Sequence, residues 1–156
     1  MNNDTQRRLE AVLDREIEAA RSLASTLDAE RVALTGNSPD AVLAQATEKT
    51  KIFGIIDALE SERRELCAAH RISLPRLQRG RSPLISGVSE SIAERWRSLL
   101  ELIAGCRIAN EVNGYIINAR RNQLNQLFQA LRGGAPVTYG PGGKLFGKAQ
   151  RALARA

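Results

Sequence analysis

The sequence has few aromatic, thiol and imidazole side chains and no long hydrophobic run. Its 156 residues include one Trp, two Tyr, three Phe, two Cys and one His. So few Cys and His residues exclude a disulfide framework and a structural zinc site. Charge interrupts every apolar stretch well before the roughly 20 residues that cross a bilayer, and the first residues lack the pattern of a signal peptide. We therefore expect a cytoplasmic protein with no transmembrane segment.

The apolar residues that are present favour a helical protein. Apolar residues make up 43% of the chain but aromatics only 4%, a balance that suits helix–helix seams better than an aromatic-filled sandwich or barrel. Apolar side chains recur at spacings of three and four in three long segments. We predict an all-α fold, an elongated antiparallel bundle of three long helices over residues 4–34, 39–69 and 91–131, with a flexible basic C-terminal arm or short helix.

The first two predicted helices each carry one apolar stripe. Between them, Gly36, Ser38 and Pro39 suit a helix end, an N-cap and a first helical position, so the helices should be antiparallel neighbours. The first stripe consists of Leu9, Leu13, Ile17, Ala20, Leu23 or Ala24, and Leu27. The second stripe consists of Val42, Ala46, Phe53, Ile56, Leu59 and Leu66.

Two basic residues, Lys49 and Arg63, fall near the second stripe. Their long stems can lie along the seam while their charged heads reach water. Alternatively, they pair with acids of the first helix such as Glu16 or Glu30. The sequence leaves both interpretations open.

The third predicted helix opens at Ser91, which has capping-box spacing to Glu94. Its seam can be written as heptads. One row is Trp96, Ile103, Asn110, Ile117, Leu124 and Leu131. The other row is Ile92, Leu99, Cys106, Asn113, Arg120 and Leu127.

Asn110 and Asn113 fall on this seam, with Gly114 beside them. Buried amides that hydrogen-bond across helices would fix the register of the bundle. Alternatively, this face opens to a partner, and Gly114 allows a close backbone approach. A turn at Asn113-Gly114 is disfavoured because the periodicity continues in phase to Leu131. The register interpretation leads on physical grounds.

The division of the chain follows its composition. Residues 1–132 are predicted to form the bundle. An exposed basic loop at 70–88, rich in Arg, Pro and Gly, interrupts it. Parts of this loop could be held against the bundle by Leu74, Leu77, Leu84 and Ile85. Residues 133–156 are predicted to be a Gly-rich arm followed by an amphipathic basic tail, too short to be a stable helix without a partner.

Charge separates the two halves of the chain. Residues 1–70 carry 9 basic and 13 acidic side chains, a net −4, whereas residues 71–156 carry 14 basic and 4 acidic, a net +10. No acidic side chain follows Glu111. Such a basic half suits nucleic acid, an anionic membrane surface or an acidic protein partner, and charge alone does not choose among them.

No constellation for catalysis, metal or cofactor emerges. Residues 142–149 match the start of a phosphate-binding loop, but Ala149 stands where Ser or Thr should hold magnesium, and no strand precedes it. Cys67 and Cys106 fall on or beside helix stripes, as small buried hydrophobes do. A Cys/His nucleophile would depend on His70 alone. We expect no enzyme and no cofactor.

Several sequence features occur in a characteristic order along the chain. Glu48-Lys49 precedes Ile52-Phe53 and Arg63, and Trp96 opens the third helix. The most specific pieces are the N-x-x-N-G-x-x-I pattern from Asn110 to Ile117 and the T-Y-G-x-x-G pattern from Thr138 to Gly143. With these features the sequence resembles the FlgN family of flagellar export chaperones over nearly its whole length, except for the basic loop and the tail beyond Gly143.

The resemblance implies a non-enzymatic helical chaperone of type III secretion. Such proteins bind C-terminal helical segments of the hook-filament junction proteins FlgK and FlgL, prevent premature polymerisation and deliver these clients to the export gate. Client contacts are attributed mainly to the C-terminal portion. Basic residues there would favour acidic flanks on the client, and Tyr139 is a candidate second contact with the gate. The expected partner-binding residues are Asn110, Asn113, Gly114, Ile117, Arg120, Arg121, Leu124, Leu127, Phe128, Leu131, Tyr139, Gly140, Lys144, Leu145, Phe146, Lys148, Arg151 and Leu153.

Two other classes of function stay open on the sequence. One is a basic helical protein that binds nucleic acid or a membrane surface, although the basic segments hold almost no stacking aromatics. The other is a coiled-coil structural adaptor, for which the long third helix is suited. The chain could be a monomer or a homodimer in any of these readings.

Overall fold

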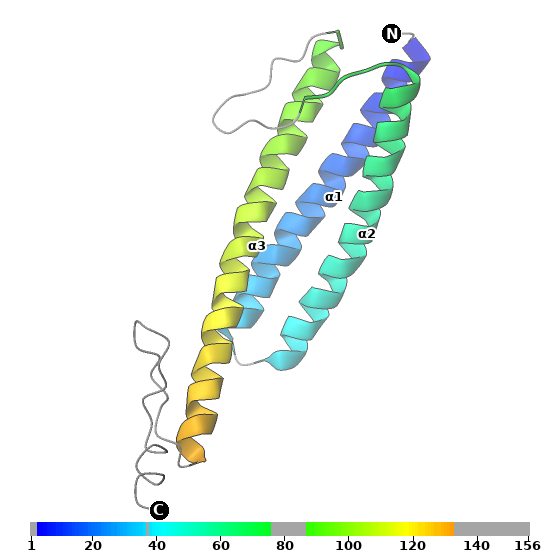
Figure 1. Ribbon diagram of the computed structural model, residues 1–156. Helices are drawn as coiled ribbons and strands as arrows, with labels where there is room; N and C mark the ends of the chain where they lie inside the picture. Colours follow the sequence, from blue (N-terminus) through cyan, green and yellow to red (C-terminus); the bar gives the residue numbers. More distant parts are fainter. Residues whose placement is uncertain (1–2, 37, 76–86, 133–156) are drawn as a thin grey trace, which may run out of the picture. The chain divides into compact units, whose positions relative to one another are not determined.

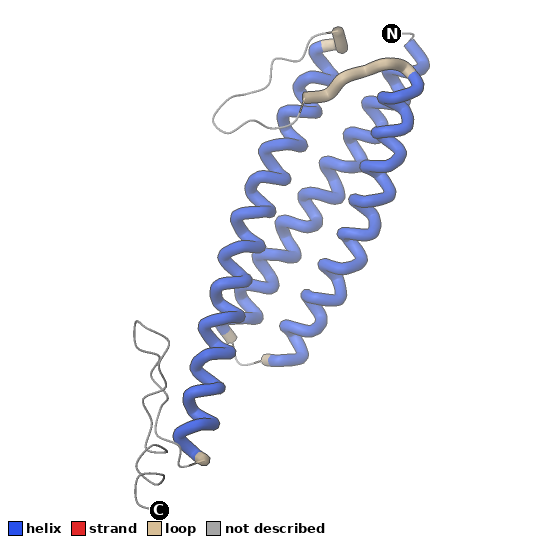
Figure 2. Tube along the Cα trace, viewed as in Figure 1, coloured by secondary structure: helices blue, strands red, loops and turns tan. Residues whose placement is uncertain are grey.

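The computed structural model describes residues 3–36, 38–75 and 87–132 of the chain. These residues form three long helices, α1 (Asn3–Thr35), α2 (Pro39–Ala69) and α3 (Glu90–Leu131), and they contain no strand (Figures 1 and 2). The prediction of an all-α bundle of three long helices is confirmed. Each helix begins and ends within one residue of the range expected above.

The chain forms two compact units, Met1–Gly114 and Tyr115–Ala156, and α3 contributes to both. The first unit contains α1, α2 and the part of α3 up to Gly114. The described part of the second unit is the remainder of α3 and Arg132. The arm and tail expected at residues 133–156 lie outside the described residues, so they stay predictions.

In the first unit α2 runs antiparallel to both α1 and α3, so α1 and α3 are parallel (Figure 1). Side-chain contacts establish these directions, because contact partners run in opposite order along α1 and α2 but in the same order along α1 and α3. The contacts are Arg15–Glu62 and Glu30–Lys49 between α1 and α2, and Asp14–Arg95 and Leu27–Asn113 between α1 and α3.

The predicted apolar stripe of α1 is buried in the core, so this prediction is confirmed. Leu9, Leu13 and Leu27 are fully buried. The stripe of α2 is only partly as expected, since Phe53 is 41% exposed and its neighbour Ile52 is 5% exposed. The buried row of α2 is Ile52, Leu59 and Leu66, which recur every seven residues. Adjacent residues lie about 100° apart around a helix, so Phe53 faces away from the row that contains Ile52. The placement of Phe53 on the buried stripe is therefore wrong.

Only one of the two heptad rows of α3 stays buried through the first unit. Ile92, Leu99, Cys106 and Asn113 are all buried, whereas the other row leaves the core after Trp96, with Ile103 47% exposed and Asn110 exposed. A spacing of seven drifts by about 20° per heptad in a straight helix, so a row at the edge of a seam turns into solvent. The expectation that Asn110 lies on the buried seam is wrong.

Serine side chains cap the two later helices. Ser38 Oγ accepts a hydrogen bond from the Ala41 amide at 3.3 Å, as the sequence predicted. At the start of α3 the cap is Ser89, whose Oγ accepts from the Ile92 amide at 3.4 Å. The capping box expected at Ser91 is thus wrong, and Ser91 instead contacts the Arg95 guanidinium.

The segment after α2 is partly fastened to the core. Ile72, Leu74 and Val88 are half-buried against the cluster of Leu9, Leu13, Trp96 and their neighbours, and Trp96 Nε1 donates a hydrogen bond to the Pro75 carbonyl at 2.8 Å. The prediction that Leu74 pins part of the loop is confirmed. Leu77, Leu84 and Ile85, the other three proposed anchors, lie outside the described residues.

Candidate partner-binding site

The end of α3 carries exposed apolar side chains at helical spacing. Their exposed fractions range from 43% for Ile117 to 74% for Leu131. At about 100° per residue they share an arc of roughly 100°. We call this set the α3 stripe, and its members are Ile117, Leu124, Leu127, Phe128 and Leu131. A contiguous apolar face of this kind marks a binding surface more often than scattered exposed leucines do.

The opposite face of the same segment is polar but uncharged. It carries five exposed amide side chains, which are Asn118, Asn122, Asn125, Gln126 and Gln129. The segment is therefore amphipathic, with an apolar face suited to another helix and an amide face suited to water.

Cations accompany the α3 stripe. Arg120 is half-buried, and Arg121 and Arg132 are exposed. Arg121 lies four residues after Ile117 and seven before Phe128, which places it at the edge of the stripe. The sequence from residue 112 onward holds seven basic and no acidic side chains.

Asn113, by contrast, is taken up by contacts inside the first unit. It is 1% exposed, and its Nδ2 donates to the Leu27 carbonyl and to Glu30 Oε2, both at 2.8 Å. Arg31 Nε donates to Asn113 Oδ1 at 3.4 Å. These cross-helix bonds are those of the register interpretation, and they leave no surface of Asn113 for a partner.

Gly114 does not serve a close helix approach. A Cβ added at this position would meet no atom within 4 Å among the described residues. No other helix of the described residues comes close to Gly114, and the expectation that it allows a partner's backbone to approach stays a prediction. The helix continues through Asn113-Gly114 without a turn, as the periodicity indicated.

The first basic residue of α2, Lys49, joins all three helices. Its Nζ lies 2.6 Å from Glu30 Oε1 and donates to Asn110 Oδ1 at 3.4 Å. Glu30 in turn accepts from Asn113 through its other oxygen. Of the two interpretations of Lys49, pairing with Glu30 is confirmed.

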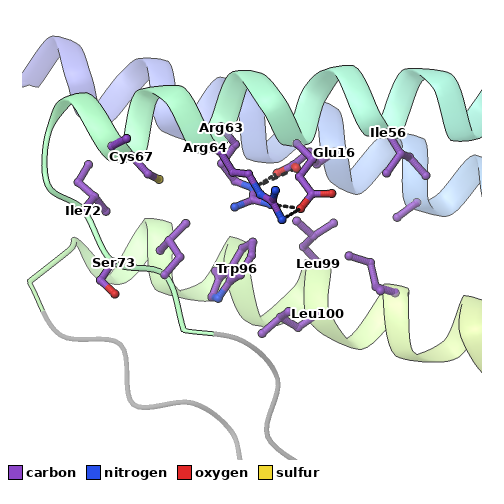
Figure 3. A pocket seen from close by; sticks show the side chains of 15 residues that line it. Glu16, Ile56, Arg63, Arg64, Cys67, Ile72, Ser73, Trp96, Leu99 and Leu100 are labelled. Carbon is purple, nitrogen blue, oxygen red and sulfur yellow. Dashed lines mark hydrogen bonds and ion pairs between the residues drawn. The ribbon is translucent and has the colours of Figure 1, made fainter.

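Arg63, the other basic residue near the α2 stripe, lines a cleft of about 670 Å³ between α2 and α3. Figure 3 shows Glu16, Arg63 and Trp96 directed toward one another. Arg63 Nε donates to both carboxylate oxygens of Glu16, at 3.0 and 2.9 Å, and the guanidinium carbon lies 4.6 Å from the centroid of the Trp96 ring. Pairing of Arg63 with Glu16 is confirmed, and its stacking on Trp96 was not foreseen.

Burial sets the acid–base properties of this cleft. Desolvation raises the pKa of Glu16 above its ordinary value of 4.5, and the attraction and hydrogen bonds of Arg63 offset part of the rise. Burial likewise raises the pKa of the Cys67 and Cys106 thiols, which makes both weak nucleophiles. Both cysteines are buried and free, as predicted.

Three further observations bear on the expected functions. The described residues contain no group of three or more His, Cys, Asp and Glu side chains placed to hold a metal ion. Within the same ranges no helix has the length and hydropathy that crossing a membrane requires. His70 is exposed at the end of α2, with Nε2 3.4 Å from Thr5 Oγ1.

The structure thus places only part of the predicted partner-binding set together. Ile117, Arg121 and the four apolar residues from Leu124 to Leu131 share the exposed end of α3, with Arg120 half-buried among them. Of the other predicted contacts, Asn110, Asn113 and Gly114 belong to the first unit. The remaining ones lie outside the described residues, namely Tyr139, Gly140, Lys144, Leu145, Phe146, Lys148, Arg151 and Leu153. Sequence reasoning missed the cleft at Arg63 and the amide face of α3, although the run of Asn and Gln after Ile117 was visible as a signal for the latter.

The chain is similar to known proteins over most of its length. The chain is 26% identical over 140 residues to the flagella synthesis protein FlgN of Salmonella typhimurium strain LT2, and equally to that of Salmonella typhi, an alignment that covers 88% of this chain and 89% of each relative. No solved structure matches the chain significantly. The family described as FlgN protein matches residues 1–146, which contain all three helices. The chain belongs to the FlgN protein family.

Proposed function

We propose that this protein is a flagellar export chaperone, which acts in the cytoplasm without catalysing a reaction. It would bind C-terminal helical segments of hook-filament junction proteins of the FlgK and FlgL type, prevent their premature polymerisation and deliver them to the type III export gate. Membership of the FlgN family and the name of the Salmonella relatives support the flagellar part of this proposal.

The observation that carries the client-binding part is the α3 stripe. Five large apolar side chains are exposed there on one face of a helix. An amphipathic client helix that covered them would remove apolar surface from water on both sides, and the same coverage would hide the client face that drives polymerisation. A complex of two helices packed side by side needs neither a deep pocket nor a cofactor.

Calorimetric titration of the full chain with the C-terminal segment of a FlgK-type protein tests the proposal. The variant Leu124→Asp/Phe128→Asp places two charges on the α3 stripe. Burial of a large apolar side chain contributes about 1.5–3 kcal/mol, so loss of two such contacts should weaken binding by roughly a hundredfold or more. The matched control is Val32→Asp/Leu43→Asp, which changes two apolar residues on α1 and α2 that are at least as exposed as Leu124 and Phe128.

The two variants separate the proposed site from a general effect of added charge. We expect the control to bind within a few-fold of the unaltered chain. If both variants bind alike, the α3 stripe is not the client site. Circular dichroism of each variant confirms that helicity is unchanged, which is expected because all four residues are exposed.

One observation favours a second candidate, a protein that binds nucleic acid or an anionic membrane through charge. It is the net +10 of residues 71–156. A gel shift titrated with salt distinguishes this function from the first, since binding through phosphates weakens steeply as salt rises. We expect no tight complex with DNA or RNA at physiological salt.

A further inference from the structure

We propose that the segment covering the α3 stripe is an acidic amphipathic helix of about four turns, with a carboxylate placed against Arg121. This inference rests on the proposed function, because it specifies the chemistry of the client that the same surface takes.

The length follows from the stripe. From Ile117 to Leu131 the helix advances about 1.5 Å per residue, or roughly 21 Å in all. A partner helix that covers this distance needs about 15 residues, with apolar side chains at spacings of three and four. Leu124 lies near the middle of the stripe, so the part of the partner that faces it should carry no charge.

The charge expected of the partner follows from the ion pairs that arginines form in the first part of α3. Between Glu90 and Glu111 every arginine of α3 has a carboxylate: Arg95 pairs with Asp14 at 2.8 Å, Arg97 with Glu90 at 2.9 Å and Arg107 with Glu111 at 3.3 Å. In the first of these pairs the acid comes from α1, the helix packed against α3.

No such acid exists further along the chain. After Glu111 the sequence holds seven cationic side chains and no acidic one. A helix that packs on the α3 stripe as α1 packs on the first part of α3 must therefore bring its own carboxylate to the edge where Arg121 lies. Electrostatic complementarity of this kind sets specificity and the rate of association more than total affinity.

Two other occupants fit the observations less well. A second copy of this chain would bring the same excess of cations to the interface, and like charges there would oppose association. A membrane surface is met by helices whose polar face is rich in Lys and Arg, whereas the polar face here carries uncharged amides such as Asn122 and Gln126.

Three synthetic peptides of about 15 residues test the proposal against the full chain. They share the same leucines at heptad positions and differ only in their flanks, which are Glu, Gln or Lys. In calorimetry at about 0.15 M salt, where the Debye length is near 8 Å, we expect the Glu peptide to bind at least tenfold more tightly than the Gln peptide. The Lys peptide should bind most weakly.

The variant Arg121→Glu separates a local pairing from attraction by the net charge. We expect it to reduce the tenfold preference for the Glu peptide to twofold or less. The control Arg7→Glu alters an exposed arginine of α1 and makes the same change in net charge, so it should leave the preference within twofold of its original value. Equal effects of the two variants, or equal affinity for all three peptides, would overturn the proposal.

Two further results distinguish the remaining possibilities. Binding of phosphatidylglycerol vesicles that depends on Arg121, without binding of the Glu peptide, would overturn the proposal in favour of a membrane. If Leu124→Asp/Phe128→Asp abolishes binding of the FlgK-type segment while Arg121→Glu does not affect it, the proposed function stands and this inference fails.

Discussion

Replacing Arg63 with Met should destabilise the bundle in a way that depends on pH. Methionine keeps the apolar stem of the side chain but removes the guanidinium that pairs with Glu16, which is 4% exposed. Loss of one partner of a buried ion pair costs about 3–5 kcal/mol. Because the adjacent cleft is open to water, we expect the lower end of this range, about 3 kcal/mol near pH 7, which includes about 0.5–1 kcal/mol from stacking on Trp96.

The sign of the pH dependence follows from the pKa of Glu16. Burial already raises this pKa above 4.5 in the folded state. At pH values between 4.5 and this raised pKa, Glu16 binds more protons in the folded state than in the unfolded state. The contribution of Glu16 to the free energy of unfolding therefore falls as pH rises through the folded-state pKa. Removing Arg63 takes away the cation that lowers the pKa, so the fall should extend to higher pH in the variant.

Urea unfolding followed by circular dichroism, at several pH values, measures the effect. Well below pH 4.5, where the carboxyl is protonated in both states, the deficit of Arg63→Met should shrink to about 1 kcal/mol. The matched control is the double variant Glu16→Gln/Arg63→Met, whose deficit should be small and independent of pH. A deficit of Arg63→Met that is the same at both ends of the pH range would refute the reasoning.

Three other substitutions probe the packing. Asn113→Ala removes hydrogen bonds to a buried carboxylate and a carbonyl, so it should lower the free energy of unfolding by about 1–3 kcal/mol in urea titrations; a change below about 0.5 kcal/mol would mean that water replaces the amide. Trp96→Phe loses one hydrogen bond and part of the cation–π contact, and a decrease of about 1–2 kcal/mol is expected in the same assay. Leu27→Ala, at a residue that is 0% exposed, should cost about 2–5 kcal/mol, whereas Leu127→Ala, at one that is 56% exposed, should stay within about 0.5 kcal/mol. Equal losses at the two leucines would contradict the assignment of core and surface.

The sequence predicted the helices and the α1 seam well because both depend on local periodicity. Leu9, Leu13 and Leu27 repeat without a competing row, so only one face of α1 can be buried. For Lys49 and Arg63 the sequence offered acids of α1 such as Glu16 and Glu30 as partners, but it left this pairing open against stems that lie along the seam with their charged heads in water.

Other features depend on the directions and distances between the helices, which the periodicity of apolar residues in the sequence does not determine. Phe53 and Ile52 are equally apolar, and only the direction of α1 decides which is buried. In α3 both heptad rows look alike, yet the one containing Ile103 faces the cleft beside α2 and is left exposed. The stacking of Arg63 on Trp96 likewise requires a three-dimensional arrangement of α2 and α3.

For the candidate site, the sequence predicted the apolar side chains of the α3 stripe but assigned Asn113 to two alternatives. Asn113 is buried against α1, and both of its amide hydrogens have hydrogen-bond partners there. Of the two alternatives, the buried amide that fixes the register of the bundle is therefore the correct one. The exposure of Leu124 and Phe128 could not be read from the pattern, because the same heptads would be buried if another helix lay alongside.

The proposed function requires a client helix to cover residues 117–131 of α3. Hydrogen–deuterium exchange of the full chain, measured with and without the C-terminal segment of a FlgK-type junction protein, tests it most directly. We predict slower amide exchange across residues 117–131 in the complex, because coverage by a second helix suppresses local opening. Protection confined to α1 and α2, with exchange of residues 117–131 unchanged while the segment is bound, would contradict the claim.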